Sequence, residues 1–153
     1  MALDPWYVTG LCDGESTFNI AEKKDNRNGR KYSSFLPTFS IFMRADDGPL
    51  LKSIREFFGE GRLHYQDRSD RKYKASPMWA YQVSGYRACQ VIMLHFNKYP
   101  MHGRKHKDFL VWREIVVTDR YAAPMTNERK MEIKIRLQEG RKFMAPSASA
   151  WCP

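Results

Sequence analysis

The sequence predicts an α+β fold in which helices cover one face of a single antiparallel sheet. Two strand-like segments follow the first helix-like segment and two more follow the second, as expected when hairpins are joined through helices. The chain has 153 residues, 42% of them hydrophobic, which suits one domain with its own core. No internal repeat is visible, so we expect one domain over residues 1–145 and a flexible tail over residues 146–153.

The first half of the chain predicts a helix, two strands and a second helix. Asp4 before Pro5 is typical of a helix start, although Asp13-Gly14 would by itself equally indicate a tight hairpin turn. Gly59 follows apolar residues at helical spacing and marks the end of the second helix. The predicted elements are a helix over 4–14, strands over 17–23 and 35–43 joined by a polar loop over 24–31, and a helix over 49–58.

The second half predicts another strand pair followed by helices. Thr126 is a suitable N-cap for the last helix, and Gly140 a suitable stop. The predicted elements are strands over 62–67 and 78–84 joined by a charged loop over 68–75, and helices over 86–97, 105–118 and 127–139.

Charge and cysteine content restrict the class of partner. The 26 lysine and arginine residues exceed the 17 acidic residues by nine, and the sequence pI is about 9.6, so a polyanion is expected, with nucleic acid first. Cys12, Cys89 and Cys152 form no CxxC pair, which favours reduced thiols inside a cell. No apolar run approaches the roughly 20 residues that span a bilayer, and no signal peptide is evident. We therefore expect a soluble protein of the bacterial cytoplasm or an organelle matrix, without a membrane partner or organic cofactor.

Strand alternation predicts a polar open face on the sheet. The side chains expected in the core are Phe18, Ile20, Phe39, Ile41, Leu63, Tyr65, Tyr81 and Val83. The opposite face then carries Thr17, Asn19, Ala21, Lys23, Thr38, Ser40, Arg62, His64, Gln66, Ala80, Gln82 and Ser84. An ordinary solvated face would show the same alternation.

The hairpin loops favour a nucleic-acid groove over a solvated face. Amide and guanidinium side chains can recognise base edges while lysine and arginine neutralise phosphates, although charge alone does not separate DNA from RNA. The basic residues of the two loops include Arg27, Arg30, Lys31, Arg68, Arg71, Lys72 and Lys74. Charge also favours phosphate contact over simple solvation for the basic residues of the last helix, Arg129, Lys130, Lys134, Arg136, Arg141 and Lys142.

Three ordered blocks resemble the LAGLIDADG homing endonucleases. The segment VTGLCDGES over residues 8–16 is similar to the signature helix of that family, with both glycines and the last acid in place. Residues 39–61 resemble the family's second strand and helix, and residues 96–112 resemble the segment before its late helix.

The resemblance implies an αββαββα unit with a saddle-shaped antiparallel sheet that binds double-stranded DNA. Because the chain has one signature, the resemblance implies a homodimer that cuts both strands of a long, nearly palindromic site, usually for intron homing. The signature helices would then pack against each other through Tyr7, Gly10, Leu11 and Gly14. Small residues permit such a close helix crossing, and the contact would offset the cost of glycine in a helix, about 1 kcal/mol each.

The resemblance also implies a metal-dependent active site. Glu15 is expected to bind Mg²⁺, or another divalent cation such as Mn²⁺, beside the cleaved phosphate, since carboxylate oxygens suit Mg²⁺. Lys105 resembles the family's active-site cation, and Arg104 is the alternative if the alignment shifts by one residue. Asp13 is expected to be an interface or helix-terminal acid rather than a ligand.

The sequence departs from the family pattern at three positions. Met43 stands where some members carry a glutamine that positions water, which would leave Ser40, Arg44 or water molecules to serve. Asp47 stands where some members carry arginine and is expected to cap the next helix, and Ser16 replaces a glycine. A maturase-like RNA-binding protein or a DNA-binding regulator that does not cut are therefore alternatives on the same fold.

Overall fold

The computed structural model describes residues 2–68, 76–118 and 125–142 of the chain. A short 3₁₀ turn, η1 (Ala45–Asp47), joins the second strand to the second helix. The other elements are α1 (Pro5–Glu15), β1 (Ser16–Arg27), β2 (Arg30–Arg44), α2 (Gly48–Phe58), β3 (Arg62–Gln66), β4 (Met78–Ser84), α3 (Tyr86–Lys98), α4 (Lys105–Val116) and α5 (Asn127–Gly140).

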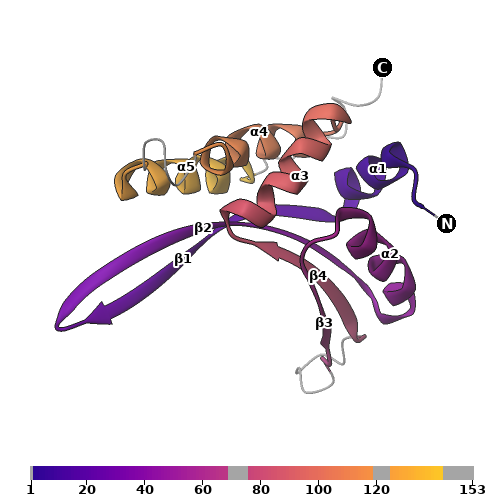
Figure 1. The fold of residues 1–153 in the computed structure, drawn as a ribbon, viewed down its shortest axis with the longest axis horizontal. Helices are drawn as coiled ribbons and strands as arrows, with labels where there is room; N and C mark the ends of the chain where they lie inside the picture. The colour runs from indigo at the N-terminus through magenta and orange to yellow at the C-terminus, as the bar shows by residue number, and fades with distance from the viewer. Residues whose placement is uncertain (1, 69–75, 119–124, 143–153) are drawn as a thin grey trace, which may run out of the picture.

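The strands form one antiparallel sheet, as predicted. The strand order is β1-β2-β4-β3, so β1 and β3 are the edges. The described helices lie on one side of the sheet, and the other side is curved and open (Figure 1). The predicted α+β class is confirmed.

Aromatic side chains from the sheet and the helices form the centre of the core. The Phe18 ring on β1 lies 5.2 Å from Phe39 on β2, 5.7 Å from Phe96 on α3 and 5.1 Å from Trp112 on α4, measured between ring centroids. All four side chains are almost fully buried. This packing fixes the base of the β1–β2 hairpin beneath α3 and α4.

The core prediction is wrong for Tyr65 on the edge strand, whereas Leu63 packs against the core as predicted. Tyr65 is 54% exposed and Leu63 is only partly buried. The five-residue β3 pairs with β4 alone, so helices cover its inner face only in part. Tyr65 packs instead against Trp79, with ring centroids 5.2 Å apart.

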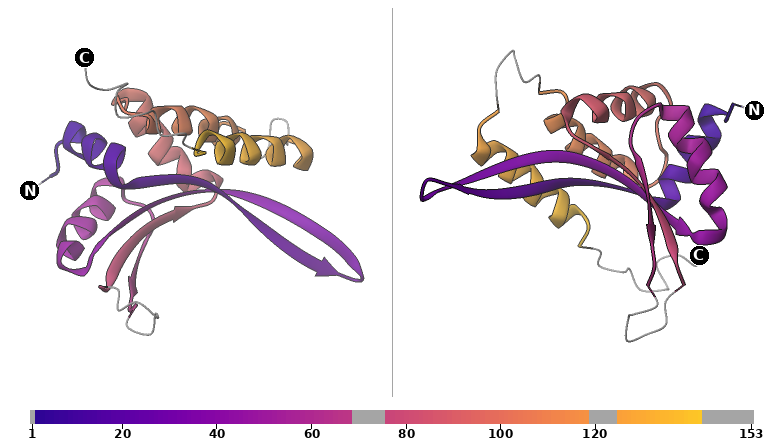
Figure 2. Two further views of the ribbon diagram at one scale, coloured as in Figure 1. Left: turned by 180° about the vertical axis from the view of Figure 1, so that it is seen from behind. Right: turned by 60° about the horizontal axis from the view of Figure 1, so that its bottom comes forward.

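The predicted polar loop over residues 24–31 is wrong. β1 and β2 stay paired out to Arg27 and Arg30, and a two-residue turn at Asn28-Gly29 connects them. Both turn residues have positive φ, 52° and 75°, as the tightest hairpin turns require. The result is a long two-stranded ribbon that projects beyond the helices (Figure 2).

Helix ends explain several of the predicted boundaries. The Asp4 carboxylate accepts hydrogen bonds from the backbone N–H groups of Trp6 and Tyr7, at 2.8 and 3.1 Å, which confirms the predicted cap of α1. The Thr126 hydroxyl similarly caps α5. Asp47 occupies the position before α2, but its side chain makes no capping hydrogen bond, so that part of the prediction is wrong.

Candidate nucleic-acid interface and active site

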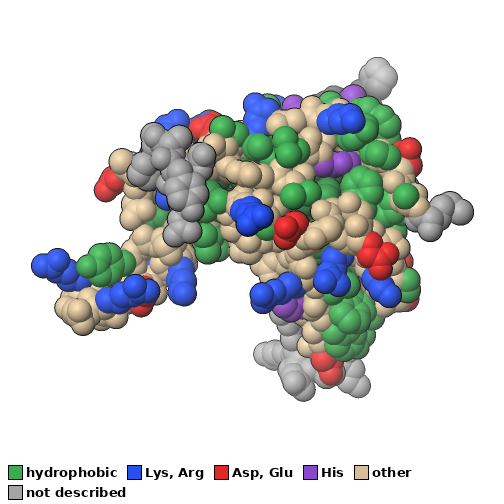
Figure 3. All heavy atoms as spheres, in the orientation of Figure 1, with side chains coloured by type: hydrophobic (Ala, Val, Ile, Leu, Met, Phe, Trp, Pro, Cys, Tyr) green, Lys and Arg blue, Asp and Glu red, His purple; other side chains and the backbone are tan. Residues whose placement is uncertain are grey.

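The strand register places the predicted polar residues on one face. One row across all four strands contains Thr17, Ser40, Gln82 and Arg62. A second row contains Asn19, Thr38 and Ser84, and His64 and Gln66 follow on β3. Lysine and arginine side chains border the hollow between the ribbon and the β3–β4 pair (Figure 3). The hollow is therefore both polar and electropositive, as a phosphate backbone requires.

Two of the predicted contact residues lie on this face without being accessible. Thr38 is 7% exposed and donates a hydrogen bond to the Asn19 carbonyl at 3.3 Å, while Ala80 is 3% exposed. Both lie on the central strands β2 and β4, where neighbouring strands shield a small side chain on either side. Thr38 and Ala80 therefore form part of the face but expose too little surface to contact a base.

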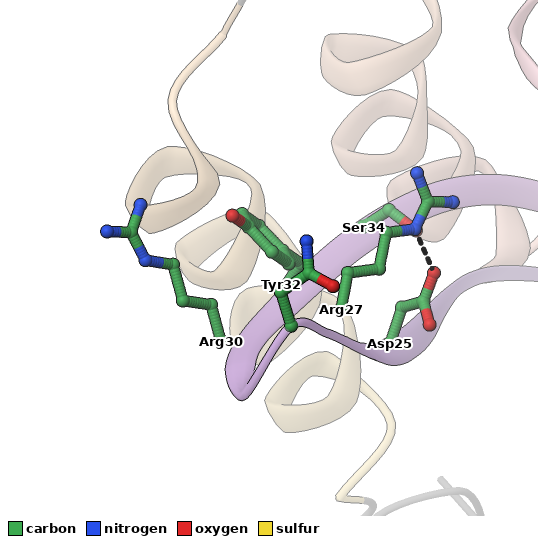
Figure 4. Close-up of a pocket in the computed structure, with 6 residues that line it drawn as sticks. Asp25, Arg27, Arg30, Tyr32 and Ser34 are labelled. Atoms are coloured by element: carbon green, nitrogen blue, oxygen red, sulfur yellow. Dashed lines mark hydrogen bonds and ion pairs between the residues drawn. The ribbon is translucent and has the colours of Figure 1, made fainter.

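One hollow lies at the far end of the ribbon rather than beside Glu15. It has a volume of about 710 Å³ and is lined by Asp25, Arg27, Asn28, Arg30, Tyr32 and Ser34 (Figure 4). Arg27 and Arg30 lie directly opposite each other across the ribbon, which is unfavourable for like charges. Arg27 is paired with Asp25 at 2.9 Å, and an anion in the hollow would relieve the remaining repulsion.

The alternation of the ribbon separates the predicted basic residues. Lys23, Arg27 and Arg30 share the open face, whereas Lys31 lies opposite Asn26 on the other face. In a loop over residues 24–31 these basic side chains could all face the same side, but strand pairing places neighbouring residues on opposite faces. Arg68 is partly buried beside Met78, and the predicted Arg71, Lys72 and Lys74 lie outside the described residues.

The preference for phosphate contact by α5 is not supported. Both guanidinium nitrogens of Arg136 donate to Glu114 on α4 at 2.9 Å, and Arg129 pairs with Glu132 at 2.7 Å. Lys134 pairs with Glu22 at 3.2 Å, and this ammonium group lowers the pKa of the Glu22 carboxyl. The Arg136 and Lys134 pairs attach α5 to α4 and β1, whereas the Arg129–Glu132 pair lies within α5.

Glu15 lies at the end of α1, where the chain enters the sheet. Its side chain is exposed. The Ser16 hydroxyl donates to the Cys12 carbonyl at 2.6 Å and so satisfies a carbonyl at the helix end. Ser16 has φ of −85°, a conformation that needs no glycine, which explains the tolerated departure from the family pattern.

Lys105 and Arg104 point to different places. The Lys105 ammonium donates to the Gly14 carbonyl at 2.9 Å, one residue from Glu15, whereas Arg104 donates to the Gly140 carbonyl on α5 at 3.2 Å. An open depression of about 480 Å³ lies here, lined by Asp13, Gly14, Gly103, Arg104, Lys105 and Asp108. Of the two predicted cations, Lys105 contacts the end of α1, whereas Arg104 contacts α5.

Burial and charge oppose each other at Lys105. Burial lowers the pKa of its ammonium group, while the nearby Asp13, Cys12, Glu15 and Asp108 side chains counteract part of that effect. The ammonium is therefore held close to the carboxylates with part of its hydration removed. A group in this setting interacts more strongly with an incoming phosphate than a fully solvated lysine would.

Asp13 fastens the start of α4 to the end of α1. Its Oδ2 accepts hydrogen bonds from the backbone N–H groups of His102 at 3.1 Å and Gly103 at 2.7 Å. A Cβ at position 103 would lie 2.5 Å from Asp13 Oδ1, so the close approach requires glycine. The carboxylate is committed to backbone donors, in accord with the expected helix-terminal role, and it fixes the turn that carries Lys105.

A buried hydrogen-bond network anchors the other side of α1. Thr9 donates its hydroxyl hydrogen to the Tyr99 carbonyl at 3.0 Å, so the bond to His95 Nε2, also 3.0 Å, requires the His95 nitrogen to be the donor. Burial among aromatic rings lowers the pKa of His95 to about 4. His95 is therefore neutral at physiological pH and holds α1 against α3.

The remaining face of α1 is uncovered. Val8, Thr9 and Cys12 are buried, while Tyr7 is 49% exposed and Gly10 and Gly14 are exposed. A Cβ added at either glycine would meet no described atom within 4 Å. Neither glycine is thus needed for packing among the described parts of the chain.

Met43 is directed away from the open face. It packs against the core, and its neighbours Phe42 and Arg44 face the hollow instead. Arg44 pairs with Asp46 at 3.3 Å. The side chains on the open face at this point of β2 are therefore those of Phe42 and Arg44, and not that of Met43.

The comparisons with known proteins agree with this architecture. Residues 8–116 match the LAGLIDADG endonuclease family. The chain belongs to the LAGLIDADG endonuclease family.

Two intron-encoded fungal proteins are similar in sequence. An uncharacterised 50.9 kDa protein in ND4 intron 1 of Podospora anserina is 29% identical over 119 residues, which is 75% of this chain and 24% of the relative. A probable intron-encoded endonuclease 3 of Neurospora crassa is 23% identical over 129 residues, covering 84% of this chain and 23% of the relative. The chain thus spans about a quarter of the length of these relatives.

Solved structures of homing endonucleases share the fold. The homing endonuclease I-TnaI has a TM-score of 0.73 at 23% identity, covering 92% of this chain and 97% of that one. I-GzeII, solved in complex with its DNA target, has a TM-score of 0.67 at 24% identity and covers 97% of this chain but 48% of that one. One LAGLIDADG unit therefore corresponds to all of the first structure and half of the second.

Metal-ligand clusters and membrane-spanning helices are both absent from the described residues. Within the described ranges, no three histidine, cysteine, aspartate or glutamate side chains converge as metal ligands. None of the described helices has the length and hydropathy to cross a membrane.

The sequence missed several features of this surface. The Asn28-Gly29 pair is a strong hairpin signal, and using it would have placed Asp25, Tyr32 and Ser34 on the open face. The contact between Asp13 and Gly103 joins residues far apart in the chain, and no local signal indicates it.

Proposed function

We propose that this LAGLIDADG unit is a site-specific endonuclease that cuts double-stranded DNA with a divalent metal ion at Glu15. The observation that carries the proposal is the position of Glu15, exposed at the end of α1 where the polar, electropositive face begins. The same helix end carries the Lys105 contact. A polar, electropositive face, a carboxylate and a cation thus meet at one place.

Glu15 fits a hard divalent cation. Its carboxylate lies at the negative end of the α1 dipole, which disfavours it by about 0.3–1 kcal/mol, and a bound cation would reverse that cost. One carboxylate supplies at most two of the six oxygen ligands that Mg²⁺ prefers, so the others would come from phosphate, water and the end of a second signature helix. When bound, the metal would lower the pKa of water and stabilise charge on the leaving oxygen.

The surrounding residues position the phosphate. Lys105 places its ammonium beside Gly14 and can neutralise a phosphate oxygen at the same helix end. Asp13 holds the turn before α4, so that the cation and Glu15 keep a fixed separation. The remainder of the face would align the duplex through its backbone and base edges.

A second copy of the unit would complete the site. The uncovered glycines of α1 allow another helix to approach closely, with Tyr7 and Leu11 beside them. Two copies related by a twofold axis would present one Glu15 to each strand of a nearly palindromic target. The 153-residue chain would thus act as a homodimer.

The test is a cleavage selection. The protein is incubated with a randomised duplex library and Mg²⁺ or Mn²⁺, the cut ends are sequenced, and a parallel sample contains EDTA. We expect one family of nearly palindromic ends that is absent with EDTA and whose yield falls steeply with salt. Ends without sequence preference, or undiminished cutting in EDTA, would refute the proposal.

A further inference from the structure

Phe42 is a large apolar side chain on an otherwise polar face. It is 38% exposed on β2, while its neighbours Ile41 and Met43 point to the opposite face, where Ile41 is fully buried and Met43 packs against the core. Phe42 itself is not part of that core. Its ring therefore faces the hollow.

The register gives Phe42 an apolar neighbour within polar surroundings. It lies opposite Ala80 on β4, and Ala80 lies opposite His64 on β3. The preceding row consists of Ser40, Gln82 and Arg62, and the following row has Arg44 and Gln66 on either side of Met78. The apolar spot is therefore the exposed part of the Phe42 ring, and side chains that can hydrogen-bond border it.

This spot lies next to the end of α1. The first register pair between β1 and β2 joins Ser16 to Ile41. Glu15, the last residue of α1, directly precedes Ser16 in the chain, and Phe42 directly follows Ile41. Phe42 therefore lies at the base of the β1–β2 hairpin, close to the end of α1, and not at the tip of the ribbon.

We propose that Phe42 recognises the 5-methyl group of a pyrimidine, thymine in ordinary DNA, in the part of each half-site next to the cleaved bond. The inference rests on the proposed DNA-binding function. The thymine methyl is the one apolar group that base edges present in the major groove, and phenylalanine is among the side chains that contact it. A polar side chain would gain nothing from that group, whereas an exposed ring buries apolar surface against it.

The test removes single methyl groups from the DNA. In a duplex recovered by the cleavage selection, each thymine near the cut is replaced in turn by deoxyuridine, which lacks only the methyl, and affinity is measured with Ca²⁺ in place of Mg²⁺. We expect one symmetry-related pair of positions at which the native protein binds about three- to fivefold more weakly per methyl removed. Replacing deoxyuridine there by deoxycytidine and 5-methyldeoxycytidine, each paired with guanine, should show the same methyl preference.

The variants assign that preference to Phe42. Phe42→Ala should bind the thymine and uracil duplexes equally, Phe42→Leu should retain part of the difference, and Ser40→Ala, one row away, should retain all of it. Because Phe42 lies outside the core, its replacement should leave the melting temperature nearly unchanged. Native protein that binds its selected duplex with no response to methyl removal, or a response that persists in Phe42→Ala, would overturn the inference and leave the proposed function intact. Failure to recover any specific duplex would overturn both.

Discussion

Replacing Gly10 by alanine separates the stability of one unit from its association with a second. Gly10 lies on the uncovered face of α1, and a Cβ there would meet no described atom within 4 Å. Alanine is favoured over glycine inside a helix by about 1 kcal/mol, so the isolated unit should become more stable. For a chain of this size, that gain corresponds to a rise of about 2–4 °C in melting temperature.

The same substitution should weaken association. If two copies of α1 meet closely at Gly10, each dimer gains two methyl groups in a packed contact, and overpacking costs about 1–3 kcal/mol per site. The dissociation constant of the dimer should therefore rise by about 30-fold or more. Stability and assembly would change in opposite directions.

Sedimentation equilibrium and thermal melting over a range of concentrations measure both effects. The native melting temperature should rise with concentration, and the Gly10→Ala variant should lose that dependence while melting higher at low concentration. Gly48→Ala is the matched control: its Cβ would lie 2.8 Å from Trp79, so it should lower stability without affecting assembly. A Gly10→Ala protein that dimerises as tightly as the native chain would refute the argument.

The remaining predictions concern the active site, the attachment of α5 and the response to acid. Asp13→Asn should reduce the cutting rate at saturating DNA with little loss of DNA affinity, because the turn before α4 loses a charged acceptor, and Gly103→Ala should do the same; equal cutting rates in a single-turnover assay would contradict this role. Glu114→Gln should lower the free energy of unfolding in urea by no more than about 1 kcal/mol, since its arginine pairs are partly exposed, and a larger loss would mean that the network is stronger than surface pairs usually are. Burial lowers the pKa of His95 from 6.5 to about 4 in the folded protein. Its contribution to stability is therefore fully present above pH 6.5 and is lost as the pH falls from 6.5 to about 4, because only the unfolded chain takes up the proton in that range. His95→Gln should flatten the pH dependence of unfolding between pH 6.5 and 4, and an unchanged slope in urea titrations over that range would contradict this role.

Local signals in the sequence were sufficient for the helices. The Asp4 carboxylate and Thr126 hydroxyl make the capping bonds expected from their positions, and Gly59 ends α2 in the left-handed conformation that glycine favours. These features depend on interactions within a few residues. The sequence therefore locates them without knowledge of the rest of the chain.

Features that depend on strand register or distant contacts were predicted less well. The polar residues of the ribbon predict a loop because they lack a buried face, although pairing through backbone hydrogen bonds needs none. Lys31 consequently lies on the opposite side from Arg30, and Tyr65 is exposed because β3 is an edge. The two candidate cations at positions 104 and 105 could be distinguished only by their contacts with α5 and α1.

The central claim is that each copy of Glu15 serves the cutting of one DNA strand. The most direct measurement is plasmid cleavage with Mg²⁺ by native protein, by Glu15→Gln, and by mixed dimers purified with two different tags, with DNA affinity measured in parallel. We predict that native protein linearises the plasmid, that Glu15→Gln binds its target without cutting, and that the mixed dimer nicks a single strand. Cutting of both strands by Glu15→Gln at the native rate would contradict the claim.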